Sequence, residues 1–66
     1  MTPAVRDQLD VIARDHDVAL DVVLEEWSER AAIREYLGGM PRAKAEREAV
    51  ADTRAMLGLP AIQEIP

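Results

Sequence analysis

Apolar residues near the start of the chain recur at helical spacings of four, three and four. This spacing places them on one face of a helix and predicts that they point inward. Thr2 followed by Pro3 is typical of a helix start, because a Thr oxygen accepts from free amides and Pro fits the first helical position. We therefore predict a helix over residues 3–15. Its inward stripe consists of Val5, Leu9, Ile12 and His16.

A second and longer helix is predicted from about Ala19 to Leu37, with Asp17 or Asp21 as its N-terminal cap. The pair Gly38-Gly39 supplies a left-handed stop. One apolar stripe of this helix consists of Leu20, Leu24, Trp27 and Ala31. Its register assigns Trp27 to the core. A second apolar set lies well round from this stripe and consists of Val22, Ile33 and Leu37. Two such faces suit a central helix, or a helix with one face for a partner.

The Ala-rich run from Arg42 to Leu57 predicts a third helix that ends at Gly58. Small alanines bury little area each, so this helix is expected to contribute less core than the others and to be the readiest to exchange partners. Its narrow apolar edge consists of Ala45, Ala49, Val50, Thr53, Met56 and Leu57. The fold class is thus all-α, a small three-helix domain over residues 1–58.

Residues 59–66 form a short apolar tail after this domain. Leu59, Ile62 and Ile65 recur every three residues, which suits packing along a groove between helices. We expect the tail to pack on its own molecule, and a role as a ligand for another protein is the alternative.

The chain has 66 residues and no cysteine, so it must be stable without a disulfide and with a small core. Self-association would supply the missing burial, and a homodimer is therefore an open alternative. Neither a secretory signal nor a membrane span is apparent. We expect a soluble, cytoplasmic protein without a cofactor.

The formal charge of -5 is distributed unevenly. Residues 1–29 hold eight acids against Arg6 and Arg14, whereas residues 30–54 hold six bases against four acids. An acidic half disfavours nucleic acid and anionic membrane, and it favours a protein partner with a basic surface. A merely solubilising surface is the alternative. The residues expected to bind the partner are Asp7, Asp10, Asp21, Glu25 and Glu29, together with Tyr36 as an exposed aromatic.

Catalysis is not expected, because the chain has one His, one Ser, no Cys and no Gly-rich phosphate loop. His16 stands between Asp15 and Asp17, but adjacent residues on a helix point in different directions and rarely share one ligand. We therefore predict no catalytic residue and no metal ligand.

The spacing of small apolar residues favours a DNA-binding protein, whereas the charge of the second helix argues against one. Ala13, Val18 and Val23 stand five residues apart, in the cadence of a helix-turn-helix, with Asp17 at the turn position usually held by Gly. The following helix offers acids where a recognition helix needs bases. A ribbon-helix-helix reading lacks the N-terminal strand. DNA binding would depend on the third helix, through Arg42, Lys44, Arg47 and Arg54.

The stretch Trp27-Ser-Glu-Arg-Ala-Ala-Ile-Arg-Glu-Tyr36, the glycine pair and Arg42-Ala-x-Ala-Glu-Arg-Glu-Ala49 resemble a tail segment of small phage- and plasmid-associated bacterial proteins. In that segment Asp often precedes the glycines and Ser often opens the next helix, whereas this chain has Leu37 and Pro41, which weakens the helix cap. The resemblance implies a mobile-element setting and no catalytic residue.

Three functional hypotheses follow. The first is a non-catalytic adaptor or inhibitor whose acidic faces dock on a basic protein surface, in the manner of a nucleic-acid mimic. The second is a structural homodimer that pairs through Val22, Ile33 and Leu37. The third is the DNA-binding regulator.

Overall fold

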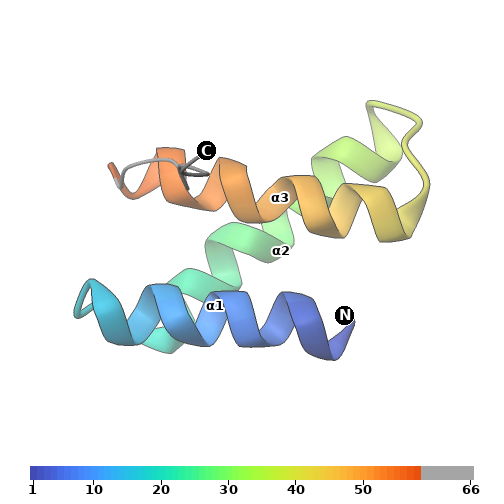
Figure 1. Cartoon of the computed structure of the whole chain (residues 1–66). Helices are drawn as coiled ribbons and strands as arrows, with labels where there is room; N and C mark the ends of the chain where they lie inside the picture. The colour runs from blue at the N-terminus through green and yellow to red at the C-terminus, as the bar shows by residue number, and fades with distance from the viewer. Residues whose placement is uncertain (59–66) are drawn as a thin grey trace, which may run out of the picture.

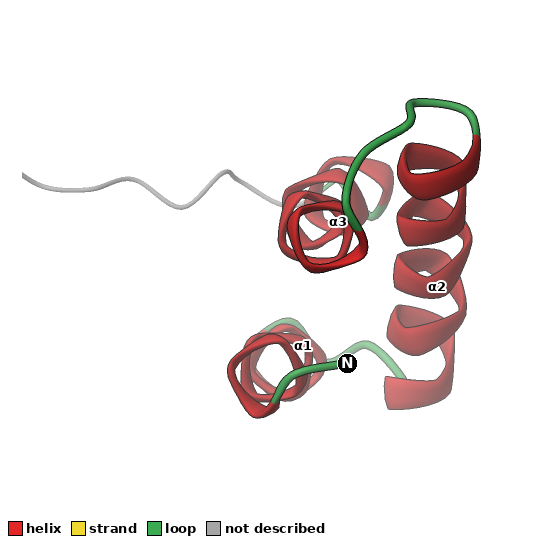
Figure 2. Cartoon of the chain, turned by 90° about the vertical axis from the view of Figure 1, so that its right-hand side faces the viewer, coloured by secondary structure: helices red, strands yellow, loops and turns green. Residues whose placement is uncertain are grey.

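The computed structural model describes residues 1–58, which form three α-helices: α1 (Pro3–Asp15), α2 (Leu20–Tyr36) and α3 (Arg42–Met56). Helices α1 and α3 lie side by side on one face of α2, and α2 crosses both of them (Figure 1, Figure 2). No strand occurs among the described residues, so the predicted all-α three-helix fold is confirmed. The predicted apolar tail, 59–66, lies outside the described residues.

Helix α1 begins and packs as its sequence predicts. The Thr2 hydroxyl oxygen accepts a hydrogen bond from the Val5 amide at 3.3 Å, and proline occupies the first turn. Val5, Leu9 and Ile12 are buried. His16, the last member of the predicted stripe, is the C-cap residue and is only partly buried.

The predicted caps of α2 are wrong. The N-cap residue is Ala19, whose side chain makes no capping hydrogen bond. Asp17 lies in the preceding turn at φ 54°, in the left-handed region that Asp tolerates better than most residues. Asp21 lies inside the first turn of the helix, where a carboxylate suits the positive end of the helix dipole. Helix α2 therefore starts without a side-chain cap.

The inward face of α2 is rotated relative to the predicted stripe. Val23, Trp27 and Ala31 are buried, as the prediction had it for Trp27 and Ala31. Leu24 packs partly buried against the core, and Leu20 is only partly buried. Because α1 and α3 both lie on one side of α2, the buried face centres on Trp27, with Val23 and Ala31 one turn away on either side.

Helix α3 buries most of its predicted edge. The buried residues are Ala45, Ala49, Val50 and Thr53. Met56, at the end of the helix, is 55% exposed, contrary to prediction, and Leu57 packs partly buried against the core. The contact of α3 with α2 is the most extensive in the fold, and the expectation that α3 is the readiest helix to exchange partners stays a prediction. Small alanines allow the two helix axes to approach.

The loop between α2 and α3 contains the predicted left-handed stop at Gly39, which has φ 63°. Gly38 is required for a different reason: a Cβ atom at this position would stand 2.7 Å from the Arg34 carbonyl oxygen. Arg34 is in the last turn of α2, so the chain leaves this helix close to its own backbone. The N-cap residue of α3 is Pro41, which provides no side-chain hydrogen bond.

Candidate protein-binding face

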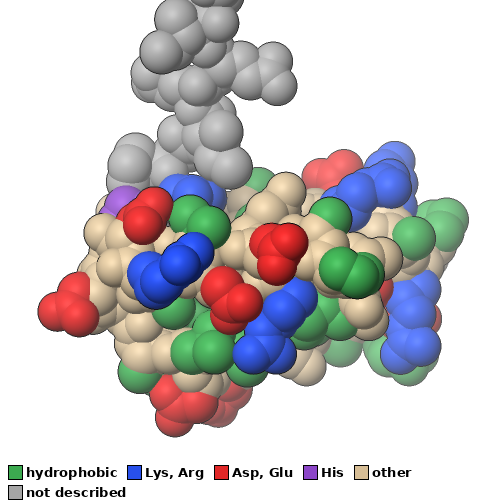
Figure 3. Space-filling model, turned by 60° about the horizontal axis from the view of Figure 1, so that its bottom comes forward, with side chains coloured by type: hydrophobic (Ala, Val, Ile, Leu, Met, Phe, Trp, Pro, Cys, Tyr) green, Lys and Arg blue, Asp and Glu red, His purple; other side chains and the backbone are tan. Residues whose placement is uncertain are grey.

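Three carboxylates lie on the outward face of α2. Asp21, Glu25 and Glu29 are exposed and are spaced four residues apart, or about 6 Å along the helix axis. Val22 and Tyr36, which are also exposed, lie on the same side. We call these five residues the α2 outer face. Figure 3 shows acidic side chains gathered at the lower edge of the view, on the outer side of the molecule.

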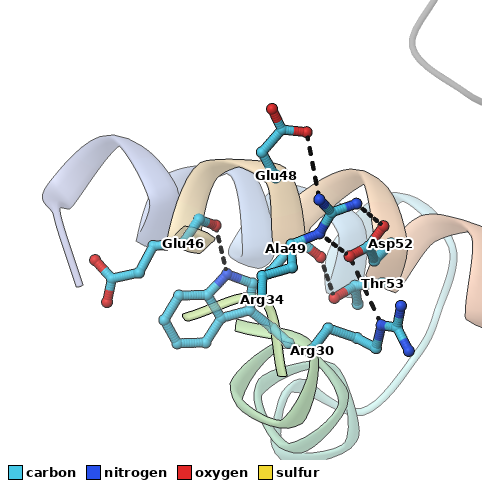
Figure 4. Close-up of polar contacts among 8 residues, drawn as sticks. Arg30, Arg34, Glu46, Glu48, Ala49, Asp52 and Thr53 are labelled. Carbon is cyan, nitrogen blue, oxygen red and sulfur yellow. Dashed lines mark hydrogen bonds and ion pairs between the residues drawn. The ribbon is translucent and has the colours of Figure 1, made fainter. Parts of the chain in front are cut away.

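The two arginines of α2 point the other way, toward α3. The Arg34 guanidinium donates two hydrogen bonds to the Asp52 carboxylate, one of them at 2.8 Å (Figure 4). The Arg30 Nε atom lies 3.6 Å from the same carboxylate, and an Arg34 nitrogen lies 3.9 Å from Glu48. No base therefore accompanies the carboxylates of the α2 outer face. Among the described residues, none of these carboxylates has an ion pair.

This ion-pair cluster changes the protonation equilibria of its members. The hydrogen bonds from Arg34 lower the pKa of Asp52 against the opposing effect of burial. The nearby positive charges of Arg34 and Arg30 lower it further. In return, the Asp52 hydrogen bond raises the pKa of Arg34. Both groups thus stay charged at neutral pH and hold α2 against α3.

A buried aromatic completes the contact between these helices. The Trp27 indole Nε1 atom donates a hydrogen bond to the Glu46 carbonyl oxygen at 2.9 Å, and Trp27 is 6% exposed. In α3, the Thr53 hydroxyl donates to the Ala49 carbonyl oxygen at 2.7 Å. Trp27 is therefore a core residue, as predicted. The polar atom of its indole is satisfied inside the fold.

The predicted acidic residues of α1 lie in a different electrostatic setting. Asp10 pairs with Arg6 at 3.2 Å. Asp7 and Asp10 line a surface hollow together with Arg14. Acidic and basic side chains alternate across the middle of Figure 3. The acidic set predicted as one partner-binding group is thus divided between a mixed surface on α1 and an uncompensated row on α2.

The residues predicted for self-association do not form one apolar patch. Val22 is 41% exposed and is flanked by Asp21 and Glu25 on the helix surface. Ile33 is partly buried. Leu37 is 84% exposed at the end of α2. Pairing two copies around Val22 would bring the carboxylates of the α2 outer face close to one another, and a homodimer through Val22, Ile33 and Leu37 stays a prediction.

One residue expected at the turn of a helix-turn-helix has the backbone conformation that the prediction requires. Asp17 adopts the left-handed conformation expected at the turn, and Ala13 and Val18 pack against the core beside buried Val23. No strand precedes α1 among the described residues, so the ribbon of a ribbon-helix-helix protein is not seen in residues 1–58. The predicted basic residues of α3 are exposed at Arg42, Lys44 and Arg47, whereas Arg54 is partly buried.

The spacing of two arginines in the sequence explains why the carboxylates on the outward face of α2 have no neighbouring base. Arg30 and Arg34 stand three and seven residues after Trp27, spacings that share a helical face with the buried indole. The sequence prediction located the carboxylates but overlooked that the neighbouring bases turn inward.

Residues 1–58 contain no group of three or more His, Cys, Asp and Glu side chains placed to hold a metal ion. None of the three helices is long and apolar enough to cross a membrane. No protein family, curated protein or solved structure matches the chain. The resemblance to phage- and plasmid-associated segments therefore stays a prediction.

Proposed function

We propose that this protein is a non-catalytic interaction module that docks the α2 outer face on a basic protein surface. The observation that carries the proposal is the separation of charge on α2: Arg30 and Arg34 pair inward with Asp52, whereas the carboxylates of the outer face have no partner among the described residues. Charges that are not neutralised locally steer a partner of opposite sign and speed its encounter.

The chemistry of the face favours a protein over a small molecule. It is a helix surface with carboxylates in a row and with exposed Val22 and Tyr36 at its sides and end. Tyr is among the residues that contribute most to protein interfaces. An acidic row of this kind suits a groove lined by Lys or Arg. An adaptor or inhibitor that occupies the nucleic-acid groove of another protein, in a phage or plasmid setting, would use such a row.

The test begins with capture of a partner from a bacterial lysate by the tagged protein, with and without nuclease. The binding rates of the isolated partner are then measured for the wild type and for two triple variants. In the first variant the α2 outer face is neutralised through Asp21→Asn, Glu25→Gln and Glu29→Gln. The second changes net charge equally at exposed positions elsewhere, through Gln8→Lys, Asp15→Asn and Asp17→Asn.

We expect the first variant to associate about tenfold more slowly at low salt and the second to change little, with the difference shrinking as salt rises. Circular dichroism should show both variants folded. Equal slowing of the two variants would mean that net charge matters rather than the α2 outer face. Unchanged association of the first variant would refute the proposal.

A DNA-binding regulator is the second candidate, because Asp17, at the turn position that Gly usually holds in a helix-turn-helix, has a positive φ of 54°. In this case Lys44 and Arg47 on α3 would contact phosphates, since the outer face of α2 repels them. Duplex DNA should then shift in a gel, and Lys44→Gln with Arg47→Gln should abolish the shift. Recovery of nucleic acid in the capture without nuclease would favour this candidate.

A further inference from the structure

An apolar protrusion stands at the C-terminal end of α2. Tyr36 is 76% exposed and Leu37 is 84% exposed, the two highest values among the large hydrophobic side chains of the described residues. Nothing in residues 1–58 covers them. Arg42, whose side chain is also 76% exposed, lies next to this protrusion and pairs at 3.8 Å with Glu35. We call Tyr36 and Leu37 the knob.

A hollow of about 480 Å³ lies near the other end of α2, between α1 and the start of α2. Its apolar lining consists of Val11, Ala13, Val18 and Leu20. Its polar lining consists of Asp7, Asp10 and Arg14. Asp7 is exposed and makes no ion pair with the described residues. The hollow therefore offers an apolar floor and an available carboxylate at its rim.

The knob cannot enter this hollow within one molecule. Leu20 and Tyr36 are the first and last residues of α2, and sixteen helical steps separate them by about 24 Å. Figure 1 shows the α1–α2 turn and the α2–α3 loop at opposite corners of the fold. Between two copies the match is complementary in charge as well, since Arg42 beside the knob suits Asp7, and Glu35 suits Arg14 at the rim.

We propose that Tyr36 and Leu37 of one copy insert into the Val11–Leu20 hollow of a second copy, in a head-to-tail contact. Such a contact uses two different surfaces of the chain, so an open assembly has a free knob at one end and a free hollow at the other. Contacts of this kind close into a ring or continue as a filament. The contact shares Tyr36 with the α2 outer face but uses none of the three carboxylates of that face, which do not line the hollow, so neutralising those carboxylates tests the proposed function without changing this contact.

Sedimentation equilibrium of the full chain tests this proposal at up to about 1 mM protein, where a contact this small should register. The wild-type mass should rise with concentration above 7.3 kDa and pass that of a dimer. A knob variant carries Tyr36→Ser and Leu37→Ser. A hollow variant carries Val11→Lys, at a position that is 36% exposed. Each variant should remain monomeric alone while retaining wild-type helicity.

The mixture of the two variants is the decisive sample. The knob variant still has a hollow and the hollow variant still has a knob, so an equimolar mixture should stop at a heterodimer. If Val11→Lys unfolds the chain, Asp7→Arg serves in its place: it should weaken association, and Arg42→Glu in the same chain should restore it. A wild type that stays monomeric, a knob variant that associates like the wild type, or a folded mixture without heterodimer would each overturn the proposal.

Discussion

Two adjacent valines provide a matched test of the packing of α2. Val23 is fully buried and Val22 is 41% exposed. Substitution of either by alanine removes the same two carbon groups from the same turn. Any gain in helix propensity is also the same at both positions, so it cancels from the difference in unfolding free energy. That difference therefore reports burial alone.

The magnitude follows from the buried area. Removal of two buried carbons costs about 1.6 kcal/mol at Val23. At Val22 the cost, scaled by its buried fraction, is about 0.9 kcal/mol. Only Val23→Ala leaves an enclosed void, which adds a further cost according to how far its neighbours relax. We expect Val23→Ala to destabilise the fold by about 1–2 kcal/mol more than Val22→Ala.

Urea unfolding measures this difference directly. Trp27 is the only tryptophan in the chain and is 6% exposed, so its fluorescence should report unfolding, with far-UV circular dichroism as an independent probe. For a domain of this size the slope is about 1 kcal/mol per molar urea, so the two midpoints should differ by about 1–2 M. Equal midpoints, or a lower midpoint for Val22→Ala, would refute the rotated register. A wild-type midpoint that rises with protein concentration, together with a Val22→Ala midpoint that does not, would indicate a dimer through this face.

Three further predictions concern the ion pair of Arg34 with Asp52 at the α2–α3 seam, the N-terminus of α2, and the loop between α2 and α3. The hydrogen bonds from Arg34 hold the pKa of Asp52 below its ordinary value of 3.8. Because the folded-state pKa is lowered, the stability that the Asp52 carboxylate contributes is present above about pH 4 and is lost as pH falls through the folded pKa. Asp52→Asn should therefore reduce the fall in unfolding free energy at acid pH, and an unchanged fall would contradict this. Ala19→Ser should raise the free energy of unfolding by about 1 kcal/mol by capping α2, whereas Ala32→Ser inside the helix should slightly lower it; equal effects would exclude capping. Gly38→Ala should lower the urea midpoint, because its Cβ would clash with a backbone oxygen 2.7 Å away, and a wild-type midpoint would show that the loop can relax.

The sequence predicted the three helices to within a residue or two, because caps, glycines and apolar spacing act locally. It misjudged the register of α2 because two stripes are possible in this helix: one runs through Leu20 and Leu24, the other through Val23, and both include Trp27. The larger leucines made the first stripe the more apolar. The choice between them is made by α1 and α3, which both pack on the side of α2 that buries Val23, and such contacts between helices have no local signature.

The sequence predicted which carboxylates share a face of α2, but it did not predict that this face is separate from the acids of α1. The four-residue spacing of Asp21, Glu25 and Glu29 guarantees a shared face, whatever the packing. The separation of that face from the acids of α1 depends on which bases lie nearby, and therefore on the tertiary structure. Arg34 and Asp52 are eighteen residues apart, and no periodicity within one helix reveals such a pair.

The same ion pairs connect stability with the proposed function, and they also allow the two to be separated. Because Arg34 and Arg30 are held by Asp52 at the α2–α3 seam, positive charge is kept inside the fold and the α2 outer face stays negative. Asp52→Asn should therefore weaken the fold while leaving the rate of partner association intact under conditions where the chain is folded. Neutralisation of Glu25 and Glu29, which lie beyond the first turn of α2, should do the reverse, since these residues make no ion pair among residues 1–58. If both changes altered stability and association together, the seam and the outer face would act as one unit, and the division of charge on α2 would not be the basis of binding.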